Sequence, residues 1–502
     1  MKKKLLVLAV TVLSQQAFAD YKDDIGYTKL QSELGFTTPA GAGVAVAHVE
    51  AAIVNTLPEA DAWMPDVSAS QFDGKSIVDR SLPSSNGISS HATGVGNLFY
   101  GNSAMASGIV NVDVYSASNW IIDGFLKTGS QFKPLLSESR IANHSWVGSM
   151  EEKDVSVEVV KENTVRVLKR VDWLVEENEF IQVAAMNNGS SNQPLLGSSY
   201  NSIGVGRTDA NHAQGSIELD STYVASRTRP DVVVPVAVTS SAAPIVAAAS
   251  AMLVEQAHSA AQGATAVISN GDAIYNGERS EVVKAVIMAG ADRISSNISS
   301  SADINNYRAE VINQTVNGLD SRYGAGQLNV DNNYQIMAAG EQDSVEDGGL
   351  ENVAMMGYDY DHAFGGAENS NAHASYFLDM IVEEKQQLTA SLVWNLDIEN
   401  TGDRSLFSPV ASLNDLDLFL YDVTGGSELL MNRSTSKIDN TENIWSFLEQ
   451  DHDYRIDVIA ADGAPFKWDY GLAWQVSAVP VPTTVWLFMS GLLGLVGVKR
   501  FS

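Results

Sequence analysis

The sequence predicts an α/β protein: a doubly wound parallel sheet, followed by a small all-β sandwich domain and a C-terminal hydrophobic helix. Between residues 41 and 340, short apolar runs alternate with segments in which apolar residues recur every three or four positions. This alternation is typical of a parallel sheet with helices on its faces. Beyond residue 352, apolar and polar residues alternate with a period of two, which indicates antiparallel strands.

The expected strands of the first part are continuous apolar runs. The run Val44-Ala-Val-Ala-His-Val49 contains no acidic or basic residue except one histidine, as expected for a parallel strand buried on both faces. Between the runs, Val157, Val160, Leu168 and Val171 share one face of a predicted helix. Further strands of this kind are expected at residues 109–115, 141–146, 181–186 and 203–205.

An acidic, glycine-containing linker at residues 341–352 separates the two predicted domains. The first domain spans residues 25–340 and the second spans residues 353–477. Alternating strands of the second are expected at residues 388–394, 416–421 and 454–459.

Composition excludes several function classes. The 502 residues include 31 Lys+Arg and 61 Asp+Glu, so the formal charge is −30, which disfavours binding to nucleic acid. No cysteine is present, so the chain forms no disulfide, zinc–thiolate site, thiol nucleophile or iron–sulfur cluster. Any catalytic chemistry therefore depends on oxygen or imidazole side chains.

The N-terminus predicts export. Lys2-Lys3-Lys4 precedes the apolar run Leu5–Leu13, and Ala17-Phe-Ala19 follows as a cleavage site. These three features are typical of a secretory signal peptide at residues 1–19, and the alternative is a buried N-terminal helix.

The C-terminal segment, residues 479–502, contains the uncharged run 485–498 between Val479-Pro-Val-Pro482 and Lys499-Arg500. It resembles the PEP-CTERM sorting signal of Gram-negative bacteria, although Val481 stands where that family usually has Glu. The resemblance implies membrane contact, an exosortase-type partner that processes the segment, and a location in the cell envelope or outside the cell. An ordinary C-terminal anchor is the alternative.

Three residues form a candidate catalytic set. Glu50 closes the strand that ends at Val49, His91 opens a helical stretch, and Ser240 lies directly before a helix rich in small residues, 245–253. A serine hydroxyl becomes a nucleophile when an imidazole takes its proton and a carboxylate orients that imidazole. Asn187, after the strand 181–186, is the candidate amide donor to an oxyanion.

The blocks around these residues resemble the subtilisin-type serine peptidases (subtilases). Ser90-His-Ala-Thr-Gly-Val-Gly96 resembles the block that opens with the catalytic histidine, and Thr239-Ser-Ser-Ala-Ala-Pro244 resembles the nucleophile block. Phe180-Ile-Gln-Val-Ala-Ala-Met-Asn-Asn-Gly189 resembles the oxyanion block, and Gly43–Glu50 resembles the strand that carries the acid. The resemblance covers residues 25–340 and implies a subtilisin-like fold, serine endopeptidase activity and no cofactor in the chemistry.

The chain departs from that pattern at three positions. Glu50 replaces the family's Asp, Gly94 replaces a second histidine, and Val238 replaces a glycine. The alternative function is therefore a catalytically inactive subtilase-fold surface protein that binds peptides or a partner.

The second domain resembles the non-catalytic, pre-peptidase C-terminal type of β-sandwich found after some bacterial subtilases. The segment Asn414-Asp-Leu-Asp-Leu-Phe-Leu-Tyr421 places Asp415 and Asp417 on one outward face. The two carboxylates are candidate ligands for a structural Ca²⁺, and a solvated acidic face is the alternative. In the first domain, residues 143–146 are expected to line the substrate cleft as an edge strand, and a role in packing alone is the alternative.

Overall fold

The structure is a computed structural model that describes residues 6–8, 21–56, 59–191, 195–259, 265–268, 271–305, 307–365, 372–378, 385–403, 405–461 and 466–478. The predicted sorting segment, 479–502, and its helix lie outside the described residues, as does the predicted signal peptide except for the backbone of β1 (Leu6–Leu8). Within these described ranges, no helix has both the length and the apolar character needed to cross a bilayer.

The predicted parallel sheet is present. It has seven strands in the order β11-β10-β9-β7-β2-β6-β5, and every neighbouring pair is parallel. The strands are β2 (Val46–Glu50), β5 (Ser76–Asp79), β6 (Asn111–Ser116), β7 (Ile141–His144), β9 (Ile181–Ala185), β10 (Ile203–Arg207) and β11 (Val232–Val234).

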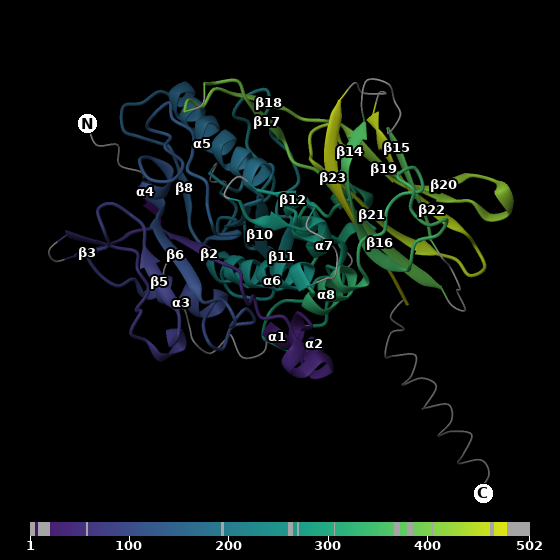
Figure 1. The fold of residues 1–502 in the computed structure, drawn as a ribbon, viewed down its shortest axis with the longest axis horizontal. Helices are drawn as coiled ribbons and strands as arrows, with labels where there is room; N and C mark the ends of the chain where they lie inside the picture. Colours follow the sequence, from purple (N-terminus) through teal and green to yellow (C-terminus); the bar gives the residue numbers. More distant parts are fainter. Residues whose placement is uncertain are drawn as a thin grey trace, which may run out of the picture.

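Helices cover both faces of this sheet (Figure 1). Val46 belongs to the apolar cluster that includes α6 (Thr239–Ser259) and the C-terminal half of α3 (Ser90–Phe99). Its neighbour Ala47 belongs to the opposite cluster, with α4 (Ala117–Ile121) and α5 (Val157–Asn178). Successive side chains of a strand point to opposite faces, so a strand between two helical layers is buried on both faces and is mostly apolar.

The strand order reverses at β2. From β2 the chain first builds β5 and β6 on one side, and it then crosses to build β7, β9, β10 and β11 on the other. Loops that leave neighbouring strands in opposite directions open a crevice at the carboxyl end of the sheet, which is where ligands bind in open α/β folds. The prediction of an edge strand at residues 143–146 is wrong, because β7 lies inside the sheet between β2 and β9. Ser145 and Trp146, which follow β7, do line a pocket at the end of the sheet.

The second half of the chain forms two four-stranded antiparallel sheets, β14-β23-β16-β21 and β15-β22-β19-β20. Buried side chains of both sheets form one shared apolar core, so they make a β-sandwich. The strands are β14 (Met356–Gly365), β15 (His373–Phe377), β16 (Gln386–Val393), β19 (Leu416–Asp422), β20 (Leu429–Ser434), β21 (Thr441–Leu448), β22 (Tyr454–Ala460) and β23 (Lys467–Ala478).

The sheet β14-β23-β16-β21 packs on α7 (Ser280–Ala289) and α8 (Val330–Ala339). A Cβ atom added at Gly471 in β23 would lie 2.7 Å from the backbone nitrogen of Val282, so only glycine permits this approach. The remaining α-helices and strands are α1 (Tyr21–Asp24), α2 (Tyr27–Leu34), β3 (Ile53–Thr56), β4 (Glu59–Ala62), β8 (Val147–Ser149), β12 (Ala266–Val267), β13 (Ala273–Ile274), β17 (Asp397–Asn400) and β18 (Pro409–Ser412).

Candidate active site

The structure brings Glu50 and His91 into contact. Glu50 is the last residue of β2, and His91 is the second residue of α3, whose start is capped by the Ser89 hydroxyl. The Nδ1 atom of His91 lies 2.8 Å from Oε1 of Glu50, and both side chains are buried. A carboxylate at Nδ1 fixes the ring tautomer that leaves Nε2 as the proton acceptor.

Glu50 also contacts a second histidine, which sequence reasoning did not single out. The Nε2 atom of His48 lies 3.1 Å from Oε2 of Glu50, and its Nδ1 lies 3.0 Å from the hydroxyl of Tyr100. The backbone N–H of Ala51 donates to Oε1 of Glu50 at 3.2 Å. Position 48 precedes Glu50 by two residues on one strand, and that spacing puts both side chains on one face.

Glu50 and His91 shift each other's pKa. Burial would raise the pKa of Glu50, but its attraction to His91 and the hydrogen bonds from His48 and His91 lower that pKa to about 2. Burial would lower the pKa of His91, but the charge and hydrogen bond of Glu50 outweigh burial and raise that pKa above its ordinary value. Glu50 is therefore ionised at neutral pH and favours a protonated His91.

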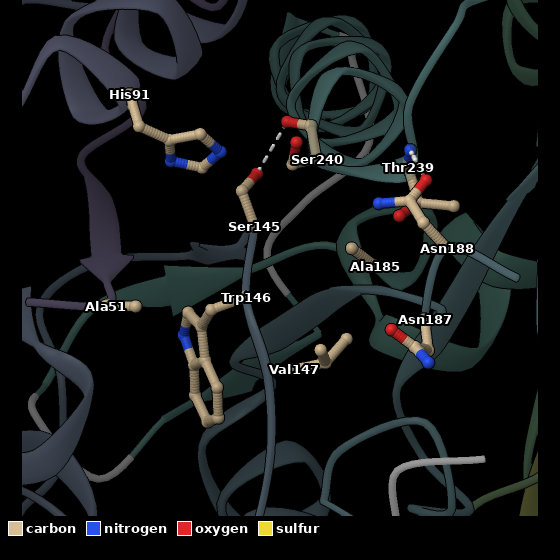
Figure 2. A pocket seen from close by; sticks show the side chains of 10 residues that line it. All are labelled: Ala51, His91, Ser145, Trp146, Val147, Ala185, Asn187, Asn188, Thr239 and Ser240. Carbon is tan, nitrogen blue, oxygen red and sulfur yellow. Dashed lines mark hydrogen bonds between the residues drawn. The ribbon is translucent and has the colours of Figure 1, made fainter. Parts of the chain in front are cut away.

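Ser240 is the second residue of α6, which starts earlier than the expected helix at 245–253. Pro244 lies four residues further along α6 and has no N–H, so the carbonyl of Ser240 lacks its usual helical donor. The hydroxyl of Ser145, in the loop after β7, donates to that carbonyl at 2.9 Å (Figure 2). This bond fixes the first turn of α6 against the end of the central sheet.

Ser240 and His91 line one pocket with a volume of about 20 Å³. Figure 2 shows the His91 ring and Ser240 on the same side of this pocket, with Ser145 next to both. No hydrogen bond joins the His91 ring to the Ser240 hydroxyl in the part of the chain that the structure describes. The other lining residues are Ala51, Ser145, Trp146, Val147, Ala185, Asn187, Asn188 and Thr239.

The two asparagines after β9 have different contacts. The side-chain amide of Asn187 donates to the backbone carbonyl and the hydroxyl of Ser191, both at 2.7 Å. In Figure 2 the Asn187 side chain lies away from Ser240. The side-chain oxygen of Asn188 accepts from the backbone N–H of Thr239 at 3.0 Å, which ties it to the N-terminus of α6. An oxyanion role for Asn187 therefore requires its amide to leave Ser191.

Two residues that depart from the subtilase pattern, Val238 and Gly94, fit the backbone without strain. Val238 is absent from the residues with positive φ, so its β-branched side chain meets no left-handed conformation before Thr239. Gly94 lies inside α3, three residues after the buried His91.

Of the two calcium candidates, Asp415 directly precedes β19 and Asp417 is its second residue. Asp417 alternates with the buried Leu416 and Leu418 and is partly exposed, as the period-two pattern predicts. Among the described residues, one group of three carboxylates has oxygens close enough together to share a metal ion: Glu341, Asp343 and Asp359.

Comparison with known proteins adds little. No protein-family model matches the chain, and no curated protein matches it. A solved structure described as that of the prenylagaramide maturation protease PagA aligns with 62% of this chain and 97% of its own chain, at 15% sequence identity and a TM-score of 0.35. A match at this identity and TM-score supports no activity for this chain.

Proposed function

We propose that the chain is a serine endopeptidase of the subtilase type in which Ser240 is the nucleophile, His91 the general base and Glu50 the orienting acid. The observation that carries this proposal is the 2.8 Å contact of Glu50 with His91, which itself lines one pocket together with Ser240. The motif blocks that surround the three residues support the same assignment.

In this mechanism the Ser240 oxygen attacks the carbonyl carbon of a peptide bond while Nε2 of His91 takes the hydroxyl proton. The imidazolium then gives that proton to the leaving amine, and an acyl-enzyme remains on Ser240. Water activated by His91 hydrolyses the acyl-enzyme. Glu50 stays ionised throughout and stabilises the positive charge on His91, in a Ser-His-Glu variant of the triad.

An extended peptide is the substrate class that the cleft favours. Val147 lines the pocket and belongs to β8, whose edge pairs with the antiparallel strand β1 from the chain's own N-terminus. An edge that accepts one extended strand offers the same backbone hydrogen bonds to another. We propose that substrate binds along this edge, with its scissile carbonyl at Ser240.

The test is covalent labelling of the purified chain by a fluorophosphonate. The wild type should label, and Ser240→Ala should not. Ser241→Ala is the matched control, because Ser241 is the next serine of the same helix and should leave labelling unchanged. Labelling that persists in Ser240→Ala would contradict the assignment of the nucleophile.

A non-catalytic peptide-binding protein is the second candidate. It is favoured by the bonds of Asn187 to Ser191 and by the lack of a hydrogen bond between His91 and Ser240 among the described residues. In that case a folded wild type would not label with fluorophosphonate, yet it would bind extended peptides. Peptide binding that Val147→Pro abolishes, without labelling, would establish this function.

We propose further that residues 1–19 export the chain and that an exosortase-type enzyme processes residues 479–502 at the cell surface. The tripartite patterns at the two ends support this proposal. Cell fractionation tests it: a chain ending at residue 478 should appear in the medium, whereas the full chain should remain with the envelope. A structural Ca²⁺ at Asp415 and Asp417 remains a separate proposal, tested by the effect of chelator on the unfolding temperature.

A further inference from the structure

The Glu50 carboxylate is hydrogen-bonded on both of its oxygens, and His91 uses only one of them. Oε1 lies 2.8 Å from Nδ1 of His91 and accepts from the backbone N–H of Ala51 at 3.2 Å. Oε2 lies 3.1 Å from Nε2 of His48, its one hydrogen-bond partner in the part of the chain that the structure describes. His48 is fully buried and Glu50 is 1% exposed. Protein groups rather than solvent therefore set the orientation of this carboxylate.

These contacts fix opposite tautomers in the two histidine rings. The pKa of Glu50 is about 2, so its carboxylate is ionised at neutral pH and only accepts hydrogen bonds. Nδ1 of His91 and Nε2 of His48 must therefore both carry protons. A neutral His48 ring then leaves its Nδ1 as an acceptor, and the Tyr100 hydroxyl, 3.0 Å away, is the donor. Burial raises the pKa of Tyr100, so the phenol keeps its proton.

Helix α3 reaches Glu50 from both of its ends. His91, in the first turn, contacts the carboxylate directly, and Tyr100, the residue that caps the C-terminus, contacts it through His48. His48 precedes Glu50 by two residues in β2, so both side chains lie on one face of the strand. Gly96 leaves room for the phenol, because a Cβ atom there would lie 2.5 Å from the Tyr100 hydroxyl oxygen.

Glutamate needs more support at this position than aspartate does. Its side chain has one more rotatable bond, so it has more rotamers in which the carboxylate lies away from Nδ1 of His91. A hydrogen bond to the second oxygen selects among them, because a displaced carboxylate would leave the buried Nε2–H of His48 without an acceptor. The strand that carries Glu50 in place of Asp thus also carries the donor that holds it.

We propose that His48, oriented by Tyr100, is a positioning residue that keeps the Glu50 carboxylate against His91. Among the described residues, neither His48 nor Tyr100 lines the pocket of Ser240, so both act through Glu50. The effect on catalysis rests on the proposed function, whereas the effect on His91 does not. If Glu50 leaves His91, burial alone acts on the imidazole, and burial favours its neutral form.

The test is a histidine titration of the full chain, which needs no substrate. Histidines are labelled with ¹³C and ¹⁵N, and the His91 signal is identified by its loss in His91→Gln. His48→Leu removes both ring nitrogens at similar volume, and it should lower the titration midpoint of His91 by about half a pH unit or more. Fluorophosphonate labelling of the same variant should slow roughly tenfold to a hundredfold, because the base is less firmly held.

Two further variants separate a hydrogen-bonding role from a packing role. His48→Gln keeps a side-chain N–H that reaches Glu50, so it should restore much of the wild-type midpoint of His91. Tyr100→Phe keeps the aromatic ring but no longer fixes the His48 tautomer, so a smaller effect on labelling is expected, roughly twofold to tenfold. If His48→Leu does not fold, Tyr100→Phe still tests the proposal through the His91 midpoint, which it should lower.

The matched control is His144→Leu. His144 is a fully buried histidine of the neighbouring strand β7, and its Nε2 lies 2.8 Å from the Gln182 side-chain oxygen. Its cross-strand partner is Val49, so it lies on the opposite face of the sheet from His48. This variant should lose stability without moving the titration midpoint of His91.

The wild type alone provides a spectroscopic test. Above the His91 midpoint, the ¹⁵N shifts should show the Nδ1–H tautomer in His91 and the Nε2–H tautomer in His48. An Nδ1–H tautomer in His48 would overturn the proposal, because that ring would have no proton to donate to Glu50.

The direction of the midpoint change decides between the remaining outcomes. An unchanged His91 midpoint in a folded His48→Leu would overturn the proposal, even if labelling slows, because the loss would then be structural. A raised midpoint would also overturn it, since Glu50 would have stayed in place and bound the imidazolium more tightly. A lowered midpoint in a chain whose wild type never labels would reject the peptidase function and support the positioning role.

Discussion

Ser145 donates its hydroxyl proton to the backbone carbonyl of Ser240, 2.9 Å away. The two residues come from different layers of the fold, one from the loop after β7 and the other from the first turn of α6. The bond exists because Pro244 cannot supply the helical N–H that would otherwise occupy that carbonyl. The position of the candidate nucleophile is thus set by the end of the central sheet as well as by its own helix.

Ser145→Ala is expected to lower both stability and labelling. The Ser240 carbonyl would lose its donor in a buried place, at a cost of about 1 kcal/mol in the free energy of unfolding. Fluorophosphonate labelling should slow by roughly tenfold, because the nucleophile would be less firmly placed. Urea unfolding and labelling rates measure the two effects. Ser145→Thr keeps a hydroxyl, and it should retain more of both properties than the alanine variant.

Glu50→Gln should nearly abolish activation of Ser240. The neutral amide neither holds the catalytic tautomer of His91 nor stabilises its charge, and losses on the order of 10⁴ in rate follow such changes in triads. Labelling rate is the measurement. Glu50→Asp keeps the charge but has a side chain one methylene shorter, so its labelling rate should lie between those of Glu50→Gln and the wild type. Equal labelling of Glu50→Gln and the wild type would contradict an orienting role.

The pH dependence of labelling should report on His91. Its pKa is raised, so the neutral, basic form predominates only above a midpoint that exceeds 6.5. Labelling should therefore rise with pH through that midpoint, and the stabilisation from the Glu50–His91 pair should fade as pH rises through it. In Glu50→Gln only burial remains, so the residual rate should show a midpoint below 6.5. A midpoint that does not move would show that Glu50 does not act on His91.

Tyr100→Phe tests whether the contact of the Tyr100 hydroxyl with His48 contributes to stability. It removes the hydroxyl that contacts Nδ1 of the buried His48, and a loss of about 1–2 kcal/mol in the free energy of unfolding is expected. Chemical denaturation measures it. Tyr115→Phe is the control, because the Tyr115 hydroxyl has no hydrogen bond among the described residues, and it should change stability less. Equal effects would indicate that the His48–Tyr100 contact contributes nothing measurable.

The oxyanion donor is tested by comparing Asn187→Ala with Asn188→Ala. If the Asn187 amide turns from Ser191 toward the reacting carbonyl, its loss should reduce labelling by about 10²–10³. Asn188→Ala instead removes the acceptor of the Thr239 N–H and should mainly reduce stability. The reverse pattern, with labelling lost only in Asn188→Ala, would move the oxyanion role to Asn188.

The sequence predicted the parallel sheet well because strands buried on both faces are mostly apolar, and β2, β9 and β10 are buried at every position. It located β16, β19 and β22 by their alternation. The short strands β5 and β11 and the sandwich strands β14, β15, β20, β21 and β23 were not predicted. Strand β20 shows why: Leu429, Leu430 and Met431 are all exposed, so it has no alternation to detect.

Residue type and order along the chain were enough to name Glu50, His91 and Ser240 as candidates. The structure brings Glu50 and His91 into contact and places His91 and Ser240 on one pocket. What the sequence alone could determine was which residues carry suitable chemistry and which strands or helices present them. Tertiary structure decided their partners: His48 and Tyr100 behind Glu50, Ser145 on the Ser240 carbonyl, and Ser191 on Asn187. Those contacts join segments up to 95 residues apart, and their geometry depends on strand order and helix placement that local patterns do not encode.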